Sequence, residues 1–210
     1  MKKILSVIFF CLILLFLPRV SHCSEIHEAA KKGDVVKLRE ILDREPSLLT
    51  TKDEIGKTPL HWAAGKNQLE VIKVLLDEYH IDVNIRNANN GTPLHVAASQ
   101  ANPQAVLILI EHGAEIDART LNNSTPLHFA IIKSGKPGHI EAAKILIEHG
   151  ADVNAKTDDG VTPLTMALFR RNTEISDLLK SKGAKPGTSK TRGGRSNNVN
   201  PYMKNYFKDR

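Results

Sequence analysis

The sequence predicts an all-α fold, a solenoid of about five stacked helix–turn–helix units. Three observations lead to this prediction. A seven-residue phrase occurs four times, and its threonines are separated by 34, 33 and 37 residues. Each copy opens with Thr-Pro, a pair that favours a helix start, and a second apolar segment follows each copy. Repetition at a period of about 20–50 residues indicates a solenoid and takes precedence over local interpretations.

Residues 1–23 have the pattern of a secretory signal peptide. Two lysines precede an apolar run over residues 4–17, and Ser21 and Cys23 stand at positions −3 and −1 of a cut after Cys23. A helix of that run would span ~21 Å, less than the ~30 Å hydrocarbon core, which disfavours an uncleaved anchor. A lipoprotein acylated at Cys23 is a third possibility. The leader looks bacterial, so we expect an exported protein, periplasmic or secreted.

Cleavage after Cys23 would also remove Cys11, so the mature chain would contain no cysteine. A disulfide framework, a thiolate nucleophile and a cysteine metal site are then excluded. The absence of thiols suits an oxidising compartment.

Residues 24–52 are predicted to form an N-terminal cap. Residues 26–30 resemble the phrase without its Thr-Pro, and Asp34 is placed to cap a second helix that carries Leu38 and Ile41. Several charged side chains between positions 31 and 40 suit an end unit that faces solvent.

The four copies of the phrase open the repeats, which we place at residues 53–86, 87–119, 120–156 and 157–186. Threonine can cap the helix, proline needs no N–H at the first helical position, and alanines allow close helix packing. The copies are Thr58–Ala64, Thr92–Ala98, Thr125–Ile131 and Thr162–Leu168. Left-handed residues are expected two positions before each threonine, where Gly56, Asn90 and Asn123 stand in the first three repeats.

The second helix of each repeat is apolar around much of its circumference, which predicts burial on two sides. Gly113 and Gly150 are expected to end two of these helices in the left-handed conformation. The first repeat has one extra residue near Tyr79 and His80, so we expect a bulge there. The third repeat has a four-residue insertion around residues 134–138, which we predict to be a loop between its helices. It is either a tolerated surface loop or a segment near a binding face.

The fourth repeat departs from the pattern in ways that suit a C-terminal cap. Thr165 replaces the histidine of the phrase, and Lys180 replaces an apolar residue of the second helix. Residues 187–210 are rich in Gly, Ser, Asn and basic residues and are predicted to be a disordered tail. Its end, Tyr202–Lys208, could form a short helix with an aromatic face that docks on a partner, an anionic surface or the array, or it could have no role.

Charge is unevenly distributed along the chain. The formal net charge is +6, of which the leader supplies +3 and the tail +5, so the body between them carries about −2. The body is therefore not a basic nucleic-acid surface, and contact with a membrane is expected only through the tail.

The repeated phrase and the run Gly150–Ala155 resemble the ankyrin-repeat family, over roughly Glu25 to Lys185. This resemblance implies stacked helix pairs with protruding β-turn fingers, and a protein-binding function through finger tips and the inner face of the first helices. The positions implied are Glu54, Ile55, Lys57, Trp62, Lys66, Ala88, Asn89, Ser99, Gln100, Leu121, Asn122, Ser124, Lys133, Asp158, Asp159, Val161, Phe169 and Arg170. We expect four apolar members to be exposed: Ile55, Leu121, Val161 and Phe169. Trp62 is either a binding hot spot or a packing residue.

The sequence indicates no enzyme activity, metal or cofactor. The three phrase histidines would lie roughly ~10 Å apart in stacked repeats, too far to share one ion, so we expect each to bond to the neighbouring backbone. Catalytic motifs such as G-x-S-x-G and H-E-x-x-H do not occur. Asp152, Asp158 and Asp159 are interpreted as solvated or capping residues.

We therefore expect a non-enzymatic, monomeric module that binds an unidentified protein. Two alternatives remain open. The tail could be an electrostatic anchor that the repeats display, or the chain could be an exported effector or inhibitor.

Overall fold

The computed structural model describes residues 24–132 and 137–187, and this part of the chain is helical without any strand. A first helix covers residues 24–32. The elements that follow are α2 (Val35–Arg44), the 3₁₀ helix η1 (Pro46–Thr50), α3 (Pro59–Lys66), α4 (Leu69–Lys73), the π-helical turn η2 (Val74–Glu78), α5 (Pro93–Ser99), α6 (Pro103–Glu111), α7 (Pro126–Ile132), α8 (Pro137–Glu148), α9 (Pro163–Phe169) and α10 (Thr173–Ser181). The predicted leader and nearly all of the predicted tail lie outside the described residues.

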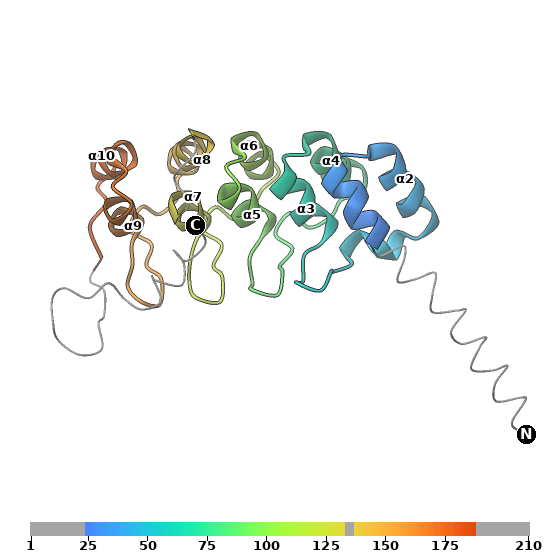
Figure 1. Cartoon of the computed structure of the whole chain (residues 1–210), viewed down its shortest axis with the longest axis horizontal. Helices are drawn as coiled ribbons and strands as arrows, with labels where there is room; N and C mark the ends of the chain where they lie inside the picture. Colours follow the sequence, from blue (N-terminus) through green and yellow to red (C-terminus); the bar gives the residue numbers. More distant parts are fainter. Residues whose placement is uncertain (1–23, 133–136, 188–210) are drawn as a thin grey trace, which may run out of the picture.

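The helices form two parallel rows (Figure 1). The first helices of the repeats, α3, α5, α7 and α9, form one row, and α4, α6, α8 and α10 form the other. Hairpin-like fingers project from the side of the first row, away from the second (Figure 1). This arrangement confirms the predicted all-α solenoid, and each unit packs on the units before and after it.

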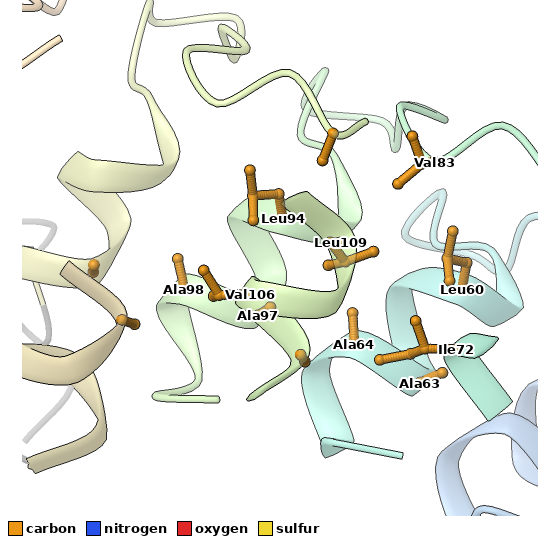
Figure 2. Close-up of a cluster of buried hydrophobic side chains, with 14 of the residues drawn as sticks. Leu60, Ala63, Ala64, Ile72, Val83, Leu94, Ala97, Ala98, Val106 and Leu109 are labelled. Carbon is orange, nitrogen blue, oxygen red and sulfur yellow. The ribbon is translucent and has the colours of Figure 1, made fainter. Parts of the chain in front are cut away.

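The core is a continuous apolar layer between the two rows and between neighbouring repeats. Figure 2 shows Ala63 and Ala64 on α3, the helix of Leu60, and Ala97 and Ala98 on α5, the helix of Leu94. Leu109 and Ile72 from the second row complete the cluster, and all four of these larger side chains are fully buried. Each such side chain stabilises the fold by about 1.5–3 kcal/mol relative to an exposed one. The paired alanines therefore set the helix spacing, and the larger residues supply most of the apolar burial.

Glycines end the second helices as predicted. Gly113 and Gly150 have φ of +84° and +94°. The next residue then closes a reversed turn, because the Ala114 N–H donates to the Leu109 carbonyl at 2.9 Å and the Ala151 N–H donates to the Leu146 carbonyl at 2.9 Å.

The extra residue of the first repeat is taken up by η2, which confirms the expected bulge. The Ile81 N–H donates to the Leu75 carbonyl at 3.1 Å, which spans one residue more than the equivalent bond from Ala114 to Leu109. A π-helical turn accommodates one inserted residue without breaking the helix. His80, with φ of +50°, follows as the left-handed residue in place of glycine.

The predicted loop over residues 134–138 is wrong at its C-terminal end. Residues 134–136 lie outside the described residues, but Pro137 and Gly138 form the first turn of α8. A Cβ atom on Gly138 would lie 2.4 Å from the Ala101 carbonyl oxygen, so α8 starts in close contact with the preceding repeat. The insertion thus lengthens the helix, because proline is well suited to a first helical turn.

The C-terminal end of the array is closed by the segment after α10. The Lys185 N–H donates to Asn154 Oδ1 at 2.8 Å, as the Asp152 N–H donates to Asp117 Oδ1 at 3.0 Å one interface earlier. The Gly187 N–H then donates to the Thr165 hydroxyl at 2.8 Å. The threonine that replaces histidine therefore binds the chain that leaves the last repeat.

Candidate functional site

The fingers are short turns whose shape is fixed by side-chain hydrogen bonds. Asn87 Oδ1 accepts from the backbone N–H groups of Asn89 and Gly91, both at 2.9 Å. Asp53 Oδ1 accepts in the same way from Ile55 and Lys57. The left-handed residues predicted at the finger bases are observed, with φ of +74° at Gly56, +59° at Asn90 and +57° at Asn123.

Neighbouring fingers are joined by backbone hydrogen bonds. The Leu121 N–H donates to the Asn89 carbonyl at 3.1 Å, and the Asp158 N–H donates to the Asn122 carbonyl at 3.2 Å. The tips of the second, third and fourth fingers are thus held in register along the array.

Arginines connect the same fingers through their side chains. The Arg86 guanidinium donates to the Arg119 carbonyl at 3.0 Å, and the Arg119 guanidinium donates to the Lys156 carbonyl at 3.0 Å. These contacts were not predicted from the sequence. The signal was a basic residue six positions before each threonine of the phrase, at Lys52, Arg86, Arg119 and Lys156.

The phrase histidines fix each finger to its neighbour, as predicted. Nε2 of His61 lies 3.1 Å from the Gly91 carbonyl oxygen, and the equivalent distances are 3.2 Å from His95 to Ser124 and 3.2 Å from His128 to Val161. A carbonyl only accepts, so Nε2 carries the proton and Nδ1 accepts from the threonine at the helix start.

These three imidazoles are held in the neutral form. Burial lowers the pKa of His61, His95 and His128 to about 4, and the hydrogen bond to the neighbouring carbonyl opposes this shift only in part. The histidines are therefore structural groups that join repeats.

Most of the predicted binding residues are accessible to solvent. Ile55 is 54% exposed, Leu121 is 72% exposed and Phe169 is 43% exposed. The others that are exposed or half-buried are Glu54, Lys57, Trp62, Lys66, Ala88, Asn89, Ser99, Gln100, Asn122, Asp158, Asp159 and Arg170. Lys133 lies outside the described residues.

Two of the predicted residues are buried, and including them was wrong. Val161 is only 4% exposed, and Ser124 is also buried. Each precedes the threonine of its repeat, and each offers its carbonyl to the histidine of the repeat before. That hydrogen bond draws the finger base against the array and takes both side chains away from solvent.

Trp62 is half-buried and packs on the core, and it also belongs to a charged cluster. Its indole N–H donates to Asp53 Oδ2 at 2.8 Å. The Lys31 and Lys57 ammonium groups lie 4.1 Å and 4.3 Å from the ring centroid, within range of cation–π attraction. The packing interpretation of this residue is confirmed, and its role as a binding hot spot stays a prediction.

Comparison with known protein families identifies the family of this array. The family profile described as ankyrin repeats (3 copies) matches residues 26–120 and 117–190, most of the chain. The chain belongs to the ankyrin-repeat family. The ankyrin array is therefore a protein-interaction scaffold, as the resemblance implied.

The relatives that match parts of the chain include two 26S proteasome regulatory subunits. The 26S proteasome non-ATPase regulatory subunit 10 of Dictyostelium discoideum is 34% identical over 91 residues, which are 43% of this chain and 39% of that relative. The probable 26S proteasome regulatory subunit p28 of Saccharomyces cerevisiae is 37% identical over 46 residues, which are 22% of this chain and 20% of that relative. The chain thus matches less than half the length of either relative.

Apolar and charged groups are placed differently at the two ends of the ankyrin array. Leu168 and Phe169 are exposed at the end of α9, near the C-terminal end, whereas the lysines around Trp62 lie near the N-terminal end. The Arg170 guanidinium donates to the Ile132 carbonyl, which fixes it against α7. A partner that lies along the fingers would meet both kinds of surface.

The described part of the ankyrin array contains no group of three or more His, Cys, Asp or Glu side chains that could hold a metal ion. None of the described helices has the length and apolar character needed to cross a bilayer.

Proposed function

We propose that this chain is a non-enzymatic module that binds one partner protein through its finger tips and the inner face of its first helices. Two observations support this proposal. Backbone hydrogen bonds join neighbouring fingers into one surface, and large apolar side chains such as Leu121 are exposed on that surface. A rigid surface loses little conformational entropy on binding, and exposed apolar side chains on it favour a protein partner. Both relatives are named as regulatory subunits of a multi-protein assembly, in keeping with this class of function.

Capture of partners by the full chain tests this proposal. Ile55→Asp and Leu121→Asp place a charge on the finger surface, and Val36→Asp is a matched control because Val36 is 68% exposed on α2. We expect a retained protein to be lost with either finger variant and kept with Val36→Asp. A retained protein that ignores both finger variants would contradict the proposal.

A second candidate function is an electrostatic anchor, in which the tail binds membrane, polysaccharide or nucleic acid. The net charge of +5 over residues 187–210 favours it. Replacing the tail's six lysines and arginines with glutamine should then abolish binding, and binding by the natural chain should weaken steeply with salt. Retention that is insensitive to both changes would exclude the anchor.

We also propose that the chain is exported to the periplasm or secreted, as an effector, an inhibitor or a scaffold. The leader pattern over residues 1–23 supports this. Mass spectrometry of the mature protein tests it, and an N-terminus at Ser24 is the expected result. An N-terminus at Met1 in a cytoplasmic fraction would contradict it.

A further inference from the structure

The Trp62 cluster is assembled from three elements that meet at the N-terminal end of the finger surface. Trp62 lies on α3, Lys57 on the first finger and Lys31 on the helix over residues 24–32. The indole N–H donates to Asp53 Oδ2 at 2.8 Å, and this hydrogen bond fixes the orientation of the ring. The two ammonium groups are therefore held by a ring that is itself positioned by the finger.

We propose that this cluster binds an acidic segment of the partner protein, with Asp or Glu carboxylates accepting from Lys31 and Lys57. This inference rests on the proposed function and specifies the partner's chemistry at one end of the surface. Lys31 already donates to Glu28 at 2.7 Å, and an ammonium group, with three N–H donors, can bind a second carboxylate. Carboxylates are the complementary acceptors for two ammonium groups that lie over one ring.

The surrounding charges favour an anion. Lys52 and Lys66 are exposed nearby, the first directly before Asp53 and the second one helical turn after Trp62. Of the three acidic neighbours, Glu54 is exposed on the first finger, and the other two are occupied within the protein. Asp53 accepts from the indole and from two backbone N–H groups, and Glu28 is paired with Lys31 at 2.7 Å.

The opposite end of the surface is more acidic, since the tip of the first finger carries one carboxylate, Glu54, near four lysines, and the tip of the fourth finger carries two carboxylates. Asp158 and Asp159 form the tip of the fourth finger. A partner with an acidic segment therefore has a preferred direction along the array, with that segment at the first finger. The chain's own tail, with a net charge of +5, is repelled by the lysines and is the wrong occupant for this end.

Trp62 makes the test direct because it is the only tryptophan in the chain. The full chain is titrated with a short Glu-rich peptide that lacks Trp, and with a Lys-rich peptide of equal length. Emission from Trp62 and the anisotropy of labelled peptide are both recorded. We expect a saturable change with the Glu-rich peptide only. Failure to saturate, or an equal response to the Lys-rich peptide, would overturn the proposal.

Variants separate this site from general attraction to a basic chain. Lys31→Ala with Lys57→Ala should weaken binding of the Glu-rich peptide at least about tenfold, as expected for losing charge-assisted hydrogen bonds. Lys73→Ala with Lys182→Ala removes the same charge at exposed positions elsewhere and should leave binding unchanged. Equal losses in the two double variants would overturn the proposal. Circular dichroism verifies that each variant is folded.

Trp62→Leu provides a second route, since it removes the ring without changing the charge. We expect the affinity for the Glu-rich peptide to fall several-fold in the anisotropy titration, and unchanged affinity would overturn the role of the ring.

A second copy of the chain could also offer Asp158 and Asp159. Self-association that is abolished by Asp158→Asn with Asp159→Asn, together with no binding of the Glu-rich peptide, would replace the proposed partner with another copy of this chain.

This inference and the proposed function can fail separately. Capture of a protein that is lost with Leu121→Asp but kept with Lys31→Ala and Lys57→Ala would leave the proposed function standing and overturn the acidic segment. Capture that responds to neither change would overturn both.

Discussion

Acid should unfold this protein through its buried histidines. His61, His95 and His128 each have a pKa lowered from 6.5 to about 4 by burial. A proton therefore binds more weakly to the folded state than to the unfolded state. The stabilisation is complete above about pH 6.5 and is lost progressively as the pH falls toward about 4.

The magnitude follows from the size of the shift. At about pH 5 each histidine lowers the free energy of unfolding by about 2 kcal/mol, and the three together by about 6 kcal/mol. Domains are commonly stable by only about 5–15 kcal/mol, so this loss is a large part of the total. His112 acts in the opposite direction, because hydrogen bonds to the Ile108 carbonyl and Asp77 raise its pKa.

Urea denaturation followed by circular dichroism between about pH 7.5 and pH 5 measures this effect. His95→Gln can still donate to the Ser124 carbonyl but does not titrate, so the dependence of stability on pH should fall by about one third. A free energy of unfolding that stays constant over this range would refute the reasoning.

Three further predictions concern stability in urea. Gly113→Ala should cost about 1–2 kcal/mol for its left-handed conformation alone, since no atom lies within 4 Å of the new Cβ. Gly56→Ala should cost clearly more, because its Cβ would lie 2.5 Å from the Ala88 nitrogen, and equal costs would show that the fingers are not in contact. Ala97→Leu should destabilise by about 1–3 kcal/mol through overpacking, whereas Ala88→Leu at an exposed finger tip should have little effect, and the reverse order would contradict the packing described. Leu109→Ala should cost about 2–5 kcal/mol, and an unchanged urea midpoint would exclude its place in the core.

The fold could be predicted from the sequence because its decisive signals are local. Thr-Pro at a helix start and glycine at a helix end act within a few residues, and Gly113 and Gly150 behave as expected. The insertion near Gly138 was harder to place because its conformation depends on contact with Ala101, from the preceding repeat.

The candidate surface was predicted less completely, because exposure depends on neighbouring repeats. Val161 and Ser124 look like finger residues in sequence, yet histidines about one repeat earlier draw their carbonyls inward. The Trp62 cluster joins Lys31, Asp53 and Lys57, whose separations in sequence follow no known motif. Such contacts are set by how repeats stack, and this cannot be deduced from one repeat alone.

The dependence of each unit on its two neighbours also shapes how the chain folds. The hydrogen bonds between repeats join residues about thirty positions apart, as from His61 to Gly91, so folding closes only short loops and never brings the two ends together. A folded pair of repeats can template the next one, and ordering can spread in either direction. A lesion at a terminal unit would fray that end. The same lesion in the middle would divide the array into two shorter segments that melt independently.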